Sequence, residues 1–250
     1  MTTKNKAAST ILATDLDGTF LGGSQGERDS LYRWIATHRD DITLIFVSGR
    51  DLPFVQSLCN SLPIRPDHVI GNVGTTVACG PDLKPHPELE AWLDACWPSG
   101  ACTQVDAVLD TFTDLTPQPA VEGRRVSRYY NDAAQAETAA AAVRTLGFDA
   151  LCSDNRFFDV LPRGVHKGAT LLRTLAALGL PAERTLVAGD TLNDLSMFDT
   201  GFAGVAVGNG EPALLTAVRD MPNVHCSPYP GAAGVLDALL AFHEGRTPYG

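Results

Sequence analysis

The feature that most constrains the fold is a series of short apolar runs, rich in β-branched residues, that alternate with helical patterns. The runs predict strands at residues 10–14, 42–47, 68–72, 184–189 and 202–208. Helical spacing of apolar residues follows several of them, at residues 30–38, 52–62, 169–178 and 192–198. Because strands joined through helices pair in parallel, this alternation predicts an α/β fold with a doubly wound, mostly parallel, Rossmann-like sheet.

The alternation weakens between residues 81 and 162, where turn-forming proline and glycine pieces interrupt the chain. This stretch contains an alanine-rich segment, 133–146, whose own propensity predicts a helix, and two runs, 124–130 and 156–161, that predict strands. We interpret residues 81–162 as an inserted α+β domain. Residues 1–80 and 163–250 then form the core that carries the doubly wound sheet.

The charge of the chain limits the classes of partner. The 250 residues carry a formal net charge of −10, whereas binding nucleic acid or an anionic membrane requires concentrated positive charge, so neither is expected as a partner. An acidic protein that binds a phosphate has to build a local positive site from a few basic residues or a cation. The first ten residues lead into only a short apolar stretch, and no apolar run is long enough to cross a bilayer, so a cytoplasmic location is expected.

Two acidic residues, Asp15 and Asp17, directly follow the first predicted strand in the segment Asp15-Leu-Asp-Gly-Thr19. Open α/β sheets place their ligands at the carboxyl ends of the strands. Two neighbouring carboxylates can divide the roles of nucleophile and proton carrier. Taken alone, the Asp-Gly pair is equally well explained as a tight turn.

Two further patterns contain groups that can bind phosphate. Ser48-Gly49-Arg50 follows the predicted strand 42–47 and precedes a helix, so the Ser48 hydroxyl and the next backbone N–H groups could hold phosphate oxygens. Lys167 opens the helix after the inserted domain, where a lysine opposes the helix dipole unless it binds an anion. Alone, the first is an ordinary turn and the second a solvated lysine.

The fourth pattern, Gly189-Asp190-Thr-Leu-Asn193-Asp194, ends the predicted strand 184–189. Asn193 and Asp194 come three and four residues after Asp190, so three oxygen-bearing side chains converge on one helical face. Oxygen ligands in this number suit Mg²⁺, which we predict as the cofactor. Alone, Asp190 is explained as a helix cap, but coincidence explains poorly why four such patterns occur in order and three of them follow predicted strands of one sheet.

Together, these four patterns resemble the four motifs of the haloacid-dehalogenase (HAD) superfamily, and the long insertion is similar to the C2-type cap of that superfamily. The resemblance covers nearly the whole chain. Within it, residues 72–75, 125–130, 158–162 and 202–209 look like the sucrose-phosphate phosphatase branch, which includes mannosylfructose-phosphate and related glycoside-phosphate phosphatases. This implies a Mg²⁺-dependent phosphatase whose substrate is a small sugar phosphate or glycoside phosphate.

The mechanism that we infer uses Asp15 as the nucleophile, with an aspartyl-phosphate intermediate, and Asp17 as the general acid and base. Asp17 would then begin protonated, its pKa raised by a neighbouring carboxylate or apolar surroundings. The resemblance implies that Mg²⁺ is held by Asp15, the backbone carbonyl of Asp17, and Asp190. The predicted phosphate-binding residues are Ser48, Gly49, Lys167 and Asn193, and the predicted supporting residues are Thr19, Arg50 and Asp194.

The inserted domain is expected to cover the catalytic edge of the sheet and to select the leaving group. Its candidates for substrate contact lie in the basic and aromatic run 124–130, and we predict Arg125, Arg128 and Tyr130 among them. Because side chains alternate along a strand, only some of this run can reach the site.

Three alternatives remain open at this point. The first is a phosphohexomutase-type phosphotransferase of the same superfamily, which returns the phosphate to a sugar rather than to water. The second is a phosphorylatable signalling module, which also combines clustered aspartates, a hydroxyl residue and a lysine on a doubly wound sheet. The third is a binding protein that keeps the fold without activity. The sequence decides neither the sugar nor the oligomeric state.

Overall fold

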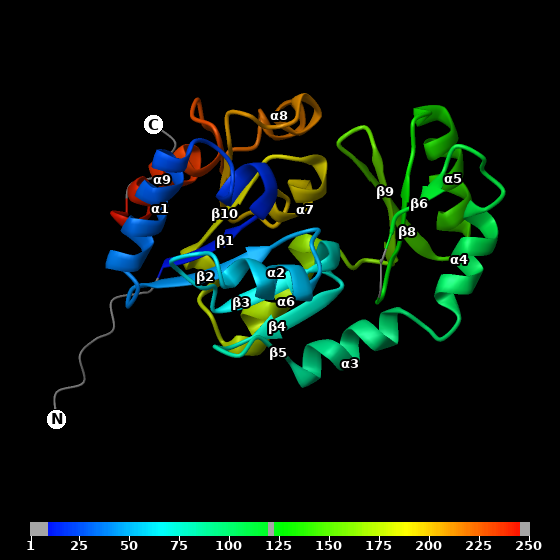
Figure 1. The fold of residues 1–250 in the computed structure, drawn as a ribbon, viewed down its shortest axis with the longest axis horizontal. Helices are drawn as coiled ribbons and strands as arrows, with labels where there is room; N and C mark the ends of the chain where they lie inside the picture. Colours follow the sequence, from blue (N-terminus) through cyan, green and yellow to red (C-terminus); the bar gives the residue numbers. More distant parts are fainter. Residues whose placement is uncertain (1–9, 120–122, 246–250) are drawn as a thin grey trace.

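The computed structural model describes residues 10–119 and 123–245, which form a larger core and a smaller domain beside it (Figure 1). Within these residues the core sheet has eight strands in the order β12-β11-β10-β1-β2-β3-β4-β5. Neighbours from β12 to β3 pair in parallel, and β4 and β5 are antiparallel. The strands are β1 (Thr10–Thr14), β2 (Ile42–Val47), β3 (His68–Gly71), β4 (Thr76–Cys79), β5 (Lys84–Pro85), β10 (Thr185–Gly189), β11 (Ala203–Ala206) and β12 (Val224–Cys226). The predicted doubly wound, mostly parallel sheet is confirmed.

Helices cover both faces of this sheet, because successive side chains of its strands point to opposite sides. In β1, Leu12 packs in the apolar cluster under α1, α2 and α9, whereas Ile11 and Ala13 pack in the cluster under α3, α6, α7 and α8. The helices are α1 (Gln25–Thr37), α2 (Leu52–Cys59), α3 (Pro87–Cys96), α6 (Lys167–Leu178), α7 (Leu195–Phe198), α8 (Pro212–Val218) and α9 (Gly231–His243). No helix in the described part of the chain is long and apolar enough to span a membrane.

Short helical turns follow the carboxyl ends of three core strands. They are η1 (Leu16–Phe20) after β1, η2 (Asn72–Gly74) after β3 and η4 (Leu192–Asp194) after β10; a further turn, η3 (Ala182–Arg184), precedes β10. Since parallel strands end at the same edge of the sheet, the turns after β1, β3 and β10 meet there. The edge therefore gathers the loops that carry the sequence patterns.

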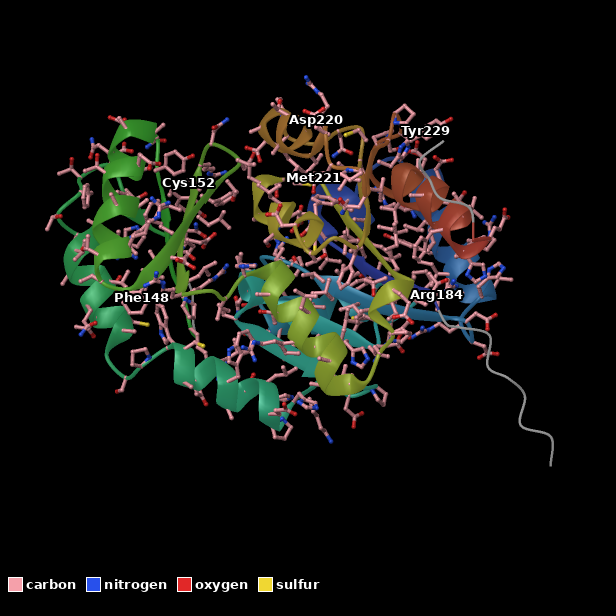
Figure 2. The ribbon with its side chains drawn as sticks, turned by 180° about the vertical axis from the view of Figure 1, so that it is seen from behind. Phe148, Cys152, Arg184, Asp220, Met221 and Tyr229 are labelled. Atoms are coloured by element: carbon pink, nitrogen blue, oxygen red, sulfur yellow. The ribbon has the colours of Figure 1, made fainter. Side chains whose placement is uncertain are left out.

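The smaller domain has an antiparallel sheet of four described strands in the order β6-β7-β9-β8. The strands are β6 (Thr116–Pro117), β7 (Val126–Tyr129), β8 (Phe148–Ser153) and β9 (Phe157–Pro162), and the helices are α4 (Ala101–Leu109) and α5 (Ala133–Thr145). Figure 1 shows both helices on the side of this sheet that faces away from the core. The opposite view in Figure 2 shows Phe148 and Cys152 in this domain, and Arg184, Met221 and Tyr229 in the core. One face of the smaller sheet therefore turns toward the core.

The start of the smaller domain differs from the expected position at residue 81. Strand β5 pairs with β4 in the core sheet, and Leu89 and Leu93 of α3 pack in a core cluster. Trp97 packs against the apolar cluster of the smaller domain instead. The proline-rich turns after residue 80 thus interrupt the core rather than end it. We propose that the smaller domain, here called the cap, comprises residues 97–162.

Helix starts follow from local capping. The hydroxyl of Ser24 accepts from the Glu27 N–H while the Glu27 carboxylate accepts from the Ser24 N–H, so α1 begins at Gln25 rather than at the predicted residue 30. Asp51 caps the N-terminus of α2, and Asp132 caps the N-terminus of α5. These caps set where each helix leaves the strand before it.

Candidate active site

A fully buried lysine joins two of the patterns. The Lys167 ammonium, at the start of α6, donates to Asp15 Oδ1 at 2.7 Å and to Asp194 Oδ1 at 2.6 Å. Burial alone would lower the pKa of Lys167, but the two carboxylates together raise it above its ordinary value, so the lysine stays charged. Burial raises the pKa of Asp15, and Lys167 acts in the opposite direction. The residues form one buried charge network although they lie far apart in the chain.

Asp194 holds the loop after β10 in shape. Its Oδ2 accepts from the backbone N–H groups of Asp190 at 2.9 Å and Thr191 at 3.1 Å, while its Oδ1 accepts from Lys167. Both of its oxygens are therefore occupied by protein donors. We infer that Asp194 orients the loop and leaves ligation to its neighbours, in line with its predicted supporting place.

Asp190 lies beside the first catalytic loop. Thr19 donates to Asp190 Oδ1 at 2.8 Å, and a side chain at Gly18, whose φ is +81°, would collide with Asp190. Only glycine therefore permits this approach. Burial and, secondarily, Asp194 raise the pKa of Asp190 to about 7.

The donor set fits a hard cation. One carboxylate oxygen from each of Asp15, Asp190 and Asp194 lies within 4.8 Å of the others, and all three residues are buried. Mg²⁺ takes oxygen ligands and usually combines one or two carboxylates with water and phosphate. With Asp194 occupied, Asp15 and Asp190 are the carboxylates that can hold it.

Glu211, which the sequence analysis did not single out, forms hydrogen bonds to the loop that carries Asp190. Its carboxylate accepts from the Leu192 N–H at 2.9 Å, and its own N–H donates to the Asp190 carbonyl at 2.7 Å. Its one sequence signal is its place after the predicted strand 202–208 and directly before Pro212, at the start of a helix on the same sheet edge.

The second pattern lies at the end of β2. Ser48 is buried, and its hydroxyl accepts from the Arg50 N–H at 3.1 Å. Arg50 reaches across to Asp17 with two hydrogen bonds, of 2.7 and 3.1 Å. The Asp17 side chain is 53% exposed. The structure therefore does not give Asp17 the apolar or acidic surroundings that the sequence analysis expected. Its partner is a guanidinium.

The loop at residues 72–74, part of a segment that carried the family resemblance, packs against the start of α6 beside Lys167. Val73 has a φ of +59°, which is strained for a β-branched residue. A side chain at Gly74 would collide with the backbone of His166 and Lys167, and Thr170 donates to the Gly74 carbonyl at 2.8 Å. This close packing sets the position at which α6 presents its lysine.

Asn193, a predicted phosphate-binding residue, lies in η4 next to the cap. Its Oδ1 is buried and has no hydrogen-bond partner among the described residues. Strand β8 of the cap packs beside η4. The cap therefore contacts the same loop that carries Asp190.

Arg128 and Tyr130, which were predicted to contact the substrate, point away from the core, so that prediction is wrong for these two residues. Arg128 pairs with Asp106 at 2.5 Å and Asp110 at 3.4 Å, on α4 and at its end. Tyr130 is buried in the apolar cluster of the cap. Alternation along β7 turns them both toward the helices, and Arg125 to the opposite face.

Comparison with known proteins gives three findings. The family model described as sucrose-6F-phosphate phosphohydrolase matches residues 8–243. The chain is 42% identical over 236 residues to glucosylglycerol-phosphate synthase from Pseudomonas anguilliseptica, covering 93% of this chain but only 30% of that protein. It is 31% identical to mannosylfructose-phosphate phosphatase from Agrobacterium fabrum, covering 95% and 98% of the two chains.

A solved structure has the same fold. The sucrose-phosphatase from Synechocystis, determined in complex with sucrose and phosphate, superposes with a TM-score of 0.86 at 23% identity, covering 95% of this chain and 99% of that one. At this identity the likeness establishes the arrangement of core and cap rather than the activity.

Proposed function

The chain belongs to the sucrose-6F-phosphate phosphohydrolase family of the HAD superfamily, and we propose that it hydrolyses the phosphomonoester of a glycoside phosphate. One observation carries this proposal most directly. The buried Lys167 ammonium touches Asp15, and Asp190 lies within reach of the same carboxylate, so Lys167 and a cation held between Asp15 and Asp190 would together place positive charge at the nucleophile. Such a site can hold a phosphate against an anionic nucleophile.

In the proposed first step, an oxygen of Asp15 attacks phosphorus in line with the departing oxygen. The bond from Asp15 to phosphorus forms as the bond from phosphorus to the leaving oxygen breaks, giving an aspartyl-phosphate. Lys167 offsets the charge that Asp15 and the phosphoryl oxygens bring together. Ser48, the backbone of Gly49 and Asn193 are the proposed additional phosphate contacts.

Asp17 is the proposed proton carrier. It would donate a proton to the departing sugar oxygen and then remove one from the water that hydrolyses the intermediate. To act as the acid, Asp17 has to leave Arg50 and take up a proton. Both side chains are about half exposed, so breaking this pair costs little.

The proposed cofactor is Mg²⁺, held by Asp15, Asp190 and the backbone carbonyl of Asp17. When bound, it would polarise the phosphoryl group and help neutralise the charge that develops during transfer. Thr19, Asp194 and Glu211 keep Asp190 and its loop in position through the hydrogen bonds described above.

The proposed substrate class follows from the relatives. Identity to part of the glucosylglycerol-phosphate synthase is 42%, against 31% to the mannosylfructose-phosphate phosphatase. We therefore put a glucosylglycerol phosphate first among the glycoside phosphates to be tested. A reaction that joins an activated sugar to a phosphorylated acceptor would supply such a substrate. The location in the cytoplasm stays a prediction from the sequence.

A phosphate-release screen tests the proposal. Glycoside phosphates, simple sugar phosphates and p-nitrophenyl phosphate are supplied with Mg²⁺ and again with a chelator, to wild type and Asp15→Asn. We expect many turnovers by wild type with Mg²⁺, and none by Asp15→Asn, whose amide lacks nucleophilic character. Formation of an isomerised sugar phosphate in place of inorganic phosphate would identify a mutase. Release that stops at one phosphate per chain would identify a signalling module.

A further inference from the structure

The face of the cap sheet that turns toward the core carries polar side chains that the mechanism above does not use. Phe158 and Val160 pack against α4 and α5, so Ser127 and Asp159, opposite each other on β7 and β9, point to the other face. Figure 1 shows the core on that side. Strand β8, which pairs with β9, packs beside η4 of the core. The Asp159 carboxylate therefore lies on the face of the cap sheet that turns toward the catalytic edge.

Asp159 is buried, with 6% of its surface exposed, yet only half of its carboxylate is bonded. Ser127 donates to Oδ1, and Arg125 Nη1 lies 3.7 Å from the same oxygen, which is too far for a hydrogen bond. In the part of the chain that the structure describes, Oδ2 has no hydrogen-bond partner. A carboxylate this poorly solvated gains strongly from a further donor.

Arg125 supplies a matching donor. Its side chain is 11% exposed, and its Nε is buried without a hydrogen-bond partner among the described residues. Its chain neighbour Arg124 donates to the Thr75 carbonyl of the core at 3.2 Å, while the Arg125 guanidinium itself lies beside Asp159 of the cap, so Arg125 stands where the two domains meet. An acceptor and a donor with spare capacity thus lie next to each other beside the catalytic centre.

A sugar ring matches this pair chemically. Each hydroxyl both donates and accepts, so two hydroxyls on adjacent ring carbons can donate to a carboxylate and accept from a guanidinium at the same time. Tyr129 and Phe157 stand on the same cap face, with ring centroids 5.9 Å apart. The Arg156 guanidinium lies over both rings, 4.7 Å from the Tyr129 centroid and 5.6 Å from the Phe157 centroid, so a further hydrogen-bond donor borders this face.

We propose that Asp159 and Arg125 determine specificity for the glycosyl part of the leaving group, by binding two neighbouring hydroxyls of its ring. This rests on the proposed function, since it concerns the substrate of the same site. Phosphoryl transfer itself needs neither residue, because the core supplies the nucleophile and the phosphate contacts. A phosphomonoester without ring hydroxyls should therefore not depend on Asp159.

The test compares two leaving groups in the full chain. Asp159→Asn replaces one carboxylate acceptor by a donor with little change in shape. We expect kcat/KM to fall about tenfold or more for the best glycoside phosphate, and to stay within about twofold for p-nitrophenyl phosphate. The phosphate-free glycoside should inhibit hydrolysis of p-nitrophenyl phosphate by wild type, with an inhibition constant about tenfold higher in the variant.

Asp154→Asn is the matched control. Asp154 is an exposed cap residue at a left-handed φ of +52°, which asparagine tolerates, and this variant should behave as wild type with both substrates. An equal loss on both substrates in Asp159→Asn, or no loss on either, would overturn the inference. If wild type releases phosphate from no phosphomonoester, the proposed function fails, and the inference fails with it.

Discussion

The catalytic edge of the core and the inward face of the cap differ in how fully their charges are bonded. In the core, Lys167 has two carboxylate partners, and Asp194 accepts from Lys167 and two backbone N–H groups. In the cap, Asp159 keeps an unbonded oxygen and Arg125 an unbonded Nε among the described residues. Lys167 and Asp194 thus have their partners within the core, whereas Asp159 and Arg125 keep hydrogen-bonding capacity that a substrate can use.

This difference separates chemistry from recognition. A phosphoryl group is common to every substrate of such an enzyme, so its contacts can be prearranged in a network that does not have to reorganise. The leaving group varies, and groups that bind it gain discrimination when their hydrogen bonds form only with the correct partner.

The largest effect is expected from Lys167→Met, which breaks the core network. It leaves Asp15 and Asp194 as close, unpaired carboxylates in a buried place. We expect kcat/KM to fall by about a thousandfold or more, and the free energy of unfolding to fall by about 3–5 kcal/mol. Phosphate release and urea unfolding measure the two. Lys84→Met, at a side chain that is 76% exposed, is the control and should change neither. A stable and active Lys167→Met would show that the network is not needed.

Removal of the Glu211 clamp should loosen the loop of Asp190 without touching the nucleophile. We expect Glu211→Ala to weaken Mg²⁺ binding about tenfold, measured by calorimetric titration of the metal alone. Glu211→Gln should stay near wild type, because its amide oxygen can still accept from the Leu192 N–H. Glu183→Ala, at an exposed position, is the control. Equal weakening in the Gln variant would instead make the Glu211 charge itself important.

Arg128→Met tests the two faces of the cap against each other. Arg128 pairs with Asp106 and Asp110 on the helix side, so its loss should lower the free energy of unfolding by about 1–2 kcal/mol. The ratio of kcat/KM for a glycoside phosphate to that for p-nitrophenyl phosphate should stay unchanged. A change in this ratio as large as that from Asp159→Asn would contradict the assignment of the inward face.

The smallest effect concerns the pH dependence of stability at His166. Its Nδ1 accepts from the Ala169 N–H at 3.2 Å, and burial lowers its pKa from 6.5. Above pH 6.5 the imidazole of His166 is neutral in both the folded and the unfolded state. Below pH 6.5 the unfolded state takes up a proton on His166 more readily, so the free energy of unfolding decreases as the pH falls. Asparagine can cap the helix without titrating. Between pH 7 and pH 5, the free energy of unfolding of His166→Asn should therefore fall less than that of wild type, with a difference below about 1 kcal/mol. Chemical unfolding at pH 7 and pH 5 measures it, and an unchanged slope would exclude His166.

The sequence predicted the core sheet well, and the candidate site residues could be located because they lie directly after its strands. Asp15, Ser48 and Asp190 each follow a run whose apolar character alone indicates a buried parallel strand. The features that the sequence did not reveal are contacts between groups remote in sequence. Glu211 binds a backbone N–H of another loop, and the Arg50 to Asp17 pair crosses between two loops.

The cap was predicted less well for a physical reason. Alternation along β7 splits residues 125–130 into two sets, but the sequence does not show which set the helices cover. Arg128 and Tyr130 turn toward the helices, whereas Arg125 lies on the face toward the core and its contact with substrate stays a prediction. Asp159 was not singled out because it lies within a predicted strand. The proposed start of the cap at residue 97 differs from the expected residue 81, because the turns after residue 80 lead into β5 and α3, which pack with the core.

The most direct test of this account is to identify the residue that carries phosphate during turnover. Wild type mixed with substrate and Mg²⁺ is quenched in acid within the first turnover, and the peptides are mapped by mass spectrometry. We predict phosphate on Asp15 in wild type and on no residue in Asp15→Asn. Phosphate on another side chain, or turnover by Asp15→Asn at the wild-type rate, would contradict the account.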